Sequence, residues 1–281
     1  MKYYIIYLIY FSISFCIGVQ GLQIPENSYI LSTSGTGIAS GNTPGLNPAL
    51  SNNNTFIQFS LNNWLSDIDG SHTSIKWGKN ILQYLSIQTW GVDNIQLRGE
   101  QPTTEPLGNF SVNFLSIAYS ISHNLNTPLN FGARLKANYS HLFIKSMQGL
   151  TIDLGARYKI NNYLASGIVL KNLGYEYINQ EKVELPQEIG LGLQFNIAPI
   201  SIFLLTDIAH IKNRGLEKRI GIKTDYKLIN IHTGITMNEG RNGQAFGLSF
   251  KIKKWLITYS LYKHENSILG FPTFLDIRLY I

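Results

Sequence analysis

Thiols are nearly absent from this 281-residue sequence, whose single cysteine is Cys16. A chain with one thiol cannot form an internal disulfide framework, and it offers no cluster of thiols for a metal. The histidines are scattered, and neither His-Glu-x-x-His nor Gly-x-Ser-x-Gly occurs. We therefore predict no catalytic residues, no cofactor and no metal, and we expect that the protein is not an enzyme.

Concentrated charge is also missing. The formal net charge of +6 is spread thinly, and the largest basic group is the short stretch Lys251-Ile-Lys-Lys254. A nucleic-acid-binding surface needs a dense basic patch with interleaved aromatic residues. The sequence therefore predicts no nucleic-acid partner.

Long apolar runs are confined to the start of the chain. Met1 and Lys2 precede an apolar run over residues 3–19, and small residues follow up to Gly21. This pattern predicts a signal peptide over residues 1–21, with the mature chain beginning at Leu22. An uncleaved anchor is the alternative, although about seventeen apolar residues is the short limit for a bilayer span. Lipidation of Cys16 is disfavoured because the bulky Phe15 precedes it.

From about Thr55 onward the sequence contains fourteen segments in which apolar side chains alternate with small or polar ones. In residues 273–281, for example, the leucines and isoleucines fall on one face, whereas Asp276, Arg278 and Tyr280 fall on the other. A soluble β-sandwich also alternates, but here the polar face is rich in glycine, serine and opposite charges, which suits the lumen of a barrel. We predict an all-β fold for residues 55–281: a transmembrane antiparallel β-barrel of about 14 strands, with twelve as the alternative and a soluble secreted β protein as the rival fold.

The connections between these segments support a barrel, because long and short ones nearly alternate, as in membrane barrels with tight turns at one end. The short connections are predicted at Gly78-Lys79-Asn80, Asn161-Asn162, Ala198-Pro199, Leu228-Ile229 and Lys253-Lys254. The two longest are predicted over Gly91–Gly108 and Leu173–Pro186. Aromatic residues near strand ends, Trp64, Trp77, Trp90, Tyr158, Tyr163, Trp255 and Tyr280, are candidates for interfacial girdles.

Residues 22–54 differ from the rest, because they are small, polar and turn-forming, without a sustained period. Two interpretations stay open: a flexible leader, or an ordered segment that plugs the barrel. A phosphate-binding loop is disfavoured, since no Gly-Lys-Ser/Thr and no following helical pattern appear.

Charged residues on the predicted lumen face are the candidate functional residues. They either pair across neighbouring strands and fill the lumen, or line a path for anionic or amphipathic ligands. The set comprises Arg134, Lys136, Asp153, Arg157, Lys159, Arg219, Lys223, Asp225, Asp276 and Arg278.

Three short motifs occur in a characteristic order. The stretch Gly35–Gly41 leads to Asn47-Pro48-Ala49, a later strand ends in Asn172-Leu173-Gly174, and a closing strand follows Gly270. In this order the motifs resemble those of the PorV/PorQ family of outer-membrane proteins. The resemblance covers residues 22–281.

This resemblance implies a FadL-like barrel in the bacterial outer membrane that takes part in type IX protein secretion. Outer-membrane lipid would surround it, and we expect secreted cargo proteins or secretion-machinery subunits to contact its long loops, Gly91–Gly108 and Leu173–Pro186. The alternative is a FadL-like transporter or porin for a hydrophobic or small solute, in which residues 22–54 are the plug.

Overall fold

The computed structural model describes residues 21–65, 67–99, 104–124, 128–178, 181–197, 201–238, 242–265 and 270–281. Of the predicted signal peptide, only Gly21 is among them, so its cleavage stays a prediction. One short helix, α2 (Ser28–Ser32), precedes the strands. Within the described residues, no helix is both long and apolar enough to cross a bilayer.

Alternating sequence becomes strand throughout the rest of the described chain. The strands are β1 (Phe56–Asn63), β2 (Asp69–Trp77), β3 (Ile81–Leu97), β4 (Gly108–Asn124), β5 (Leu129–Leu142), β6 (Lys145–Lys159), β7 (Leu164–Ile178), β8 (Glu181–Val183), β9 (Glu188–Ile197), β10 (Ile202–Ile211), β11 (Gly215–Tyr226), β12 (Ile229–Met237), β13 (Gly243–Ile252), β14 (Trp255–His264) and β15 (Thr273–Tyr280).

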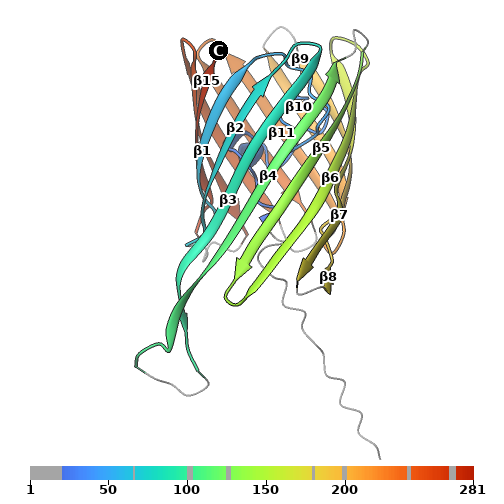
Figure 1. The fold of residues 1–281 in the computed structure, drawn as a ribbon. Coiled ribbons are helices and arrows are strands. Elements are labelled where there is room, and N and C mark those ends of the chain that lie inside the picture. Colours follow the sequence, from blue (N-terminus) through green and yellow to red (C-terminus); the bar gives the residue numbers. More distant parts are fainter. Residues whose placement is uncertain are drawn as a thin grey trace, which may run out of the picture.

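Apart from β8 and β9, strands that follow one another in the chain pair antiparallel, and β1 closes the ring by pairing with β15 from Phe56↔Tyr280 to Asn63↔Thr273. The short β8 pairs only with the end of β7, and β7 continues to β9. Fourteen strands therefore form a closed barrel with one extra strand (Figure 1). The predicted fold class is confirmed. Closure leaves no free sheet edge along the barrel wall, as a bilayer requires.

The outer face of the barrel is apolar and exposed. On β1 the side chains of Ile57, Phe59 and Leu61 are 43%, 43% and 52% exposed, while the residues between them are buried. Exposed aromatic residues flank this apolar band, with Tyr158, Tyr163, Tyr226 and Trp255 near one end and Tyr139, Tyr175 and Tyr177 near the other. An exposed apolar belt between two aromatic girdles is what a lipid bilayer stabilises.

The inner face is polar and buried, which reverses the arrangement of a soluble protein. Ser60, Ser120 and Asp276 are at most 4% exposed although all three are polar. The apolar side chains thus point out toward lipid, as the alternation predicts, and the polar ones point into the lumen.

The two ends of the barrel differ in their connections. Short turns join the strands at the end where β1 begins and β15 ends, at the top of Figure 1, and we call this the short-turn end. The turns at Gly78-Lys79-Asn80 and Lys253-Lys254 lie where the sequence predicts, and the β11–β12 turn is Lys227-Leu228, one residue earlier than predicted. The opposite end is the long-loop end.

The two longest predicted connections are wrong in extent, because strands continue into both. β3 and β4 run on to Leu97 and Gly108 as a two-stranded hairpin that projects beyond the barrel at the lower left of Figure 1. A register shift between Val92 and Ile95 interrupts the alternation there, and this hides the extension in the sequence. Likewise, β7 continues to Ile178 and pairs with β8, so the predicted strand end at Asn172-Leu173-Gly174 lies in mid-strand.

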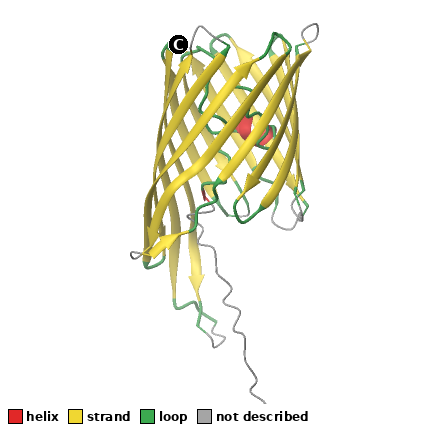
Figure 2. Cartoon of the chain, turned by 90° about the vertical axis from the view of Figure 1, so that its right-hand side faces the viewer, coloured by secondary structure: helices red, strands yellow, loops and turns green. Residues whose placement is uncertain are grey.

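The segment before β1 lies inside the barrel (Figure 2). Asn27 accepts a hydrogen bond from the Ile30 N–H and caps α2, which has a single turn. Most of residues 27–50 are buried. We call residues 22–54 the plug.

Candidate functional site: the plugged lumen

The plug follows the inner wall around the barrel, and it meets the strands in descending order. Ser28 contacts Asp276 on β15, Ser34 contacts Thr236 on β12, and Gly37 contacts Asp207 on β10. Further along, the Ala39 carbonyl accepts from Arg157 on β6, and the Leu50 carbonyl accepts from Asn130 on β5. Successive plug residues are therefore bonded to strands that follow one another around the barrel, and the segment contacts most of the circumference of the lumen.

Glycines on the inner wall make room for this path. At each of them a side chain would collide with the plug: at Gly167, for example, a Cβ would lie 2.6 Å from the Ile38 carbonyl oxygen. Because glycine carries no side chain, the plug backbone packs directly on the strand backbone. The glycines with plug atoms within contact distance are Gly132, Gly155, Gly167, Gly190, Gly192, Gly221, Gly234 and Gly247.

Two buried aspartates hold the plug by its backbone. The Asp276 carboxylate accepts from the Ser28 N–H at 3.0 and 3.1 Å and from the Ser28 hydroxyl at 2.8 Å. The Asp207 carboxylate accepts from the N–H groups of Gly37 and Ile38 at 2.6 and 3.1 Å. Backbone N–H groups are good partners for a buried carboxylate, because the bonds are charge-assisted and satisfy donors that have no partner in a helix or sheet.

Asn47 of the motif Asn47-Pro48-Ala49 joins the plug to two adjacent strands. Its side-chain amide donates to the Ile38 carbonyl within the plug at 2.8 Å, and to the Ala156 carbonyl on β6 at 3.2 Å. Its side-chain oxygen accepts from the Ala49 N–H at 2.9 Å. The side chain therefore fixes a tight turn in the plug and anchors that turn to the wall.

Glu26 is the single charged residue of the plug, and it forms an ion pair with the wall. Its carboxylate lies 2.5 Å from the Arg134 guanidinium on β5 and 3.8 Å from His72 Nε2 on β2. Burial raises the pKa of the Glu26 carboxyl, but the positive charge of Arg134 and its hydrogen bond outweigh burial and hold that pKa below its usual range. Glu26 is therefore an anion at neutral pH.

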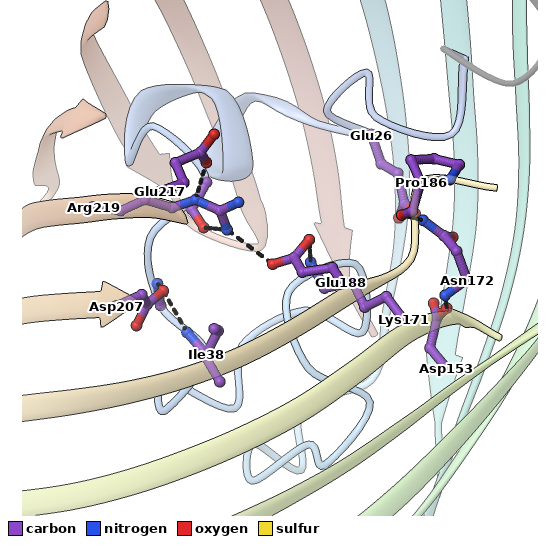
Figure 3. Close-up of polar contacts among 12 residues, drawn as sticks. Glu26, Ile38, Asp153, Lys171, Asn172, Pro186, Glu188, Asp207, Glu217 and Arg219 are labelled. Carbon is purple, nitrogen blue, oxygen red and sulfur yellow. Dashed lines mark hydrogen bonds and ion pairs between the residues drawn. The ribbon is translucent and has the colours of Figure 1, made fainter. Parts of the chain in front are cut away.

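Asn172 belongs to a second motif and lies at an irregularity between β6 and β7. Its backbone has a positive φ of 57°, and its N–H donates to the Asp153 carboxylate at 2.8 Å. Lys136 lies 2.7 Å from the same carboxylate and donates to the Asn172 side-chain oxygen at 2.6 Å. The motif thus forms a buried polar junction where the ladder shifts register, rather than the end of a strand (Figure 3).

Arg219 is at the centre of a second buried network. Its guanidinium lies 3.2 Å from Glu188 on β9, pairs with Glu217 on its own strand and donates to the Gly35 carbonyl of the plug (Figure 3). Lys171 lies 3.2 Å from the other oxygen of Glu188. These charges neutralise one another, and Arg219 at the same time provides a hydrogen-bond donor for a plug carbonyl.

The remaining predicted lumen residues are nearer the short-turn end and are less buried. Lys223 pairs with Asp225 at 2.8 Å, and Arg278 donates to the Gln58 side-chain oxygen at 2.8 and 2.5 Å. Lys159 is exposed at the end of β6. Among the described residues, most of the predicted charged set therefore pairs with other wall residues or with the plug, and none of the contacts tests a role in ligand passage.

An aromatic cluster lies inside the barrel at the long-loop end, where it packs around Leu31 of α2. Its ring centroids lie close together: Trp90 and Phe274 are 5.8 Å apart, and Trp64 and Phe274 are 6.2 Å apart. The first residues of the plug pack against it. The aromatic cluster comprises buried Leu31, Trp90, Phe114 and Phe274, with partly buried Leu22, Ile24, Trp64, Ile68 and Tyr262 packed against them.

This cluster corrects part of the predicted girdle, because Trp64 and Trp90 face the lumen and not the membrane interface. The sequence carried a signal for Trp90, which shares its strand face with Ser86 and Gln88. Two polar atoms in or beside the cluster, Trp90 Nε1 and His264 Nε2, are buried and have no hydrogen-bond partner among the described residues. The cluster is therefore apolar with two polar positions.

Metal ligands do not gather in the part of the chain that the structure describes, where no group of three His, Cys, Asp or Glu side chains is arranged to hold an ion. The charged groups of the lumen are arranged in pairs with opposite charges, and the arrangement suits fastening of the plug.

These features define a transmembrane β-barrel with an internal plug and an aromatic cluster at one mouth. No family model and no curated protein sequence matches the chain. Solved structures do. The chain matches the Ralstonia pickettii toluene transporter TbuX with a TM-score of 0.68 and 11% identity, covering 91% of this chain and 98% of that one.

Two further structures match over similar lengths. The CymD monoaromatic hydrocarbon channel gives a TM-score of 0.65 at 12% identity, over 91% of this chain and 97% of that one. The Pseudomonas putida toluene transporter TodX gives 0.63 at 10% identity, over 90% and 96%. At such identity the likeness shows the fold alone, which is a FadL-like barrel.

Proposed function

We propose that this protein is a non-enzymatic transporter of the bacterial outer membrane that admits a small hydrophobic solute. The observation that carries the proposal is the aromatic cluster, which lies on the lumen side of the long-loop mouth and includes the first apolar residues of the plug. Aromatic side chains with a few polar atoms are what binding sites for small apolar molecules present to their ligands. Toluene and monoaromatic hydrocarbons, named for the structural neighbours, are therefore suitable first probes.

The plug would control the access of such a solute to the aromatic cluster. Leu22 and Ile24 pack against the aromatic cluster, so a solute that binds there competes with the chain's own apolar side chains. We expect the more deeply anchored residues, from Ser28 to Leu50, to stay bonded to the wall while the solute binds. The solute therefore reaches the aromatic cluster when the first plug residues are displaced and the rest stay in place.

Tryptophan fluorescence tests the proposed binding site. One variant keeps only Trp90, with Trp64, Trp77 and Trp255 changed to Phe, and a matched control keeps only Trp255, which is 46% exposed on the lipid face. We expect toluene to change the Trp90 signal saturably and the Trp255 signal linearly, since the second reports partition into lipid. Linear responses from both would contradict binding in the aromatic cluster.

A second candidate function is the one implied by the family resemblance, in which the protein contacts secreted cargo or secretion-machinery subunits. The β3–β4 hairpin favours it, because this hairpin projects beyond the barrel at the long-loop end. Replacing residues 93–111 by a tight turn separates the two functions. Loss of protein export with unchanged toluene binding would support secretion, whereas unchanged export would leave the hairpin without that role.

A further inference from the structure

Lysines are unevenly distributed among the turns of the short-turn end. Three of its turns contain them: Lys79 lies between β2 and β3, Lys227 between β11 and β12, and Lys253 and Lys254 between β13 and β14. The remaining connections at this end, residues 125–128, 160–163 and 198–201, contain no charged residue, and no connection at this end contains Asp or Glu. We call Lys79, Lys227, Lys253 and Lys254 the basic arc.

The three turns of the basic arc lie on one side of the rim. β12 pairs with β13, so the turns that contain Lys227 and Lys253 are neighbours. Only β15 and β1 separate β14 from β2, which leads into the turn with Lys79. The basic arc is therefore a continuous stretch of one half of the rim.

Exposed apolar side chains lie within two residues of each of these lysines, and Ile81, two residues after Lys79, is 45% exposed. Tyr226 and Leu228 on either side of Lys227 are 65% and 63% exposed, and the Lys227 Nζ lies 5.3 Å from the Tyr226 ring centroid. Ile252 and Trp255 on either side of the lysine pair are 57% and 46% exposed. Side chains of this kind lie at the boundary between hydrocarbon and headgroups, which sets the lysines at headgroup height.

The lysines of the basic arc are also without a counter-ion in the described part of the chain. None of them pairs with a side-chain carboxylate of the described residues, and Asp225, the acid nearest Lys227 in sequence, pairs with Lys223. At the long-loop end the charges are mixed, and Lys212 lies 2.8 Å from Glu184. The basic arc therefore presents an unneutralised positive potential in the plane of the membrane surface.

We propose that the basic arc binds the anionic phosphate headgroups of phospholipids in the leaflet at the short-turn end, which is the periplasmic leaflet in barrels of this class. Lipid is favoured over an acidic soluble protein because the lysines alternate with apolar side chains that extend into the lipid itself. A lysine at the surface of an anionic membrane strengthens the attraction about fivefold. Four on one side of the rim therefore select anionic over zwitterionic lipid at that position.

Native mass spectrometry of the full-length protein released from detergent tests this proposal. The probes are phosphatidylglycerol and phosphatidylcholine at equal concentration, and the readout is the ratio of the two bound lipids. The test variant changes Lys79, Lys227, Lys253 and Lys254 to Gln, and we expect its preference for phosphatidylglycerol to fall about fivefold or more. A variant with Lys253→Gln and Lys254→Gln alone is the fallback for poor folding, with a smaller loss expected.

The matched control removes the same charge at the other end, by changing exposed Lys145, Lys182, Lys218 and Lys263 to Gln. It is expected to keep the wild-type preference, and heat-dependent gel mobility verifies that each variant is folded. An equal loss in the control would overturn the proposal, since the effect would then follow net charge alone. No preference for phosphatidylglycerol in the wild-type protein would also overturn it and favour an acidic protein as the partner.

Discussion

The two faces of β5 place opposite demands on the same strand. On the outer face, Phe131, Ala133 and Leu135 meet lipid, which adapts to side chains of any shape. On the inner face, Gly132 touches the backbone of Pro48, and Arg134 pairs with Glu26. The outer face therefore needs only apolar character, whereas the inner face needs one shape and one charge pattern. The wall is therefore generic toward the membrane and specific toward the plug.

The largest effect is expected from a substitution on the inner face of β5, with a substitution at the adjacent outer-face position as its control. Gly132→Leu would place a side chain where the Pro48 carbonyl lies, so the plug cannot seat against β5. We expect this variant to conduct ions in planar bilayers and to lose its heat-dependent gel shift at a lower temperature. Ala133→Leu on the outer face is the control and should change stability by less than about 0.5 kcal/mol. Equal behaviour of the two variants would refute the specific role of the inner face.

Removing a buried acceptor should be the next largest change. Asp207→Ala leaves the N–H groups of Gly37 and Ile38 without their partner, and each unsatisfied buried donor costs about 1–3 kcal/mol. We expect a lower thermal unfolding midpoint and a leak of small ions past the plug. Asp207→Asn keeps an acceptor and should recover part of the loss. An unchanged midpoint in the alanine variant would mean that the plug is not held at this point.

The Glu26 ion pair should give a pH-dependent effect. The folded-state pKa of Glu26 is lowered, so its contribution to stability is present above its ordinary pKa of 4.5 and is lost as the pH falls through the folded value. Glu26→Gln should therefore lower the free energy of unfolding at pH 7 by about 1.5–3 kcal/mol, and by much less in strong acid. Thermal unfolding of both proteins across this pH range measures the difference. A gap that does not narrow in acid would contradict the assigned charge.

The smallest effect is expected at the ion pair of Lys223 and Asp225, whose side chains are 21% and 36% exposed. A pair this accessible contributes about 0–1 kcal/mol, because water and salt screen it. Asp225→Asn should leave the unfolding midpoint and the conductance nearly unchanged. If Asp225→Asn lowered the midpoint as much as Asp207→Ala, then burial would not explain the difference expected between these two lumen aspartates.

The strands and their orientation were predictable because the signal is local. In residues 151–159, alternation alone assigned Ile152, Leu154 and Tyr158 to the outside and Asp153 to the lumen, and the structure has them there. The turn at Lys253-Lys254 followed from the same reasoning. Alternation fails where the backbone departs from regular pairing, as at the shift between Val92 and Ile95, and so the projecting hairpin was predicted to be a loop.

The site was less predictable, because its contacts join residues far apart in sequence. The alternation predicts that Asp276 and Arg219 face the lumen. It does not predict that Asp276 binds Ser28 or that Arg219 binds the Gly35 carbonyl, because these contacts depend on the path of the plug. Residues 28–50 have no period that reveals such a path. Asp207, Glu26 and the wall glycines were not identified as site residues for the same reason. Asp207 had a local signal, because it is the one acidic residue in β10.

The descending order in which the plug meets the strands has a consequence for biogenesis. Ser28 precedes every strand of the barrel in the chain, yet its partner Asp276 lies in β15, the strand that is exported after all the others. The beginning of the plug must therefore wait for the whole chain before its binding place exists. Pairing of β1 with β15 and binding of the plug are therefore a single late event. A barrel that lacks β15 would have neither the closing strand pair nor a bound plug.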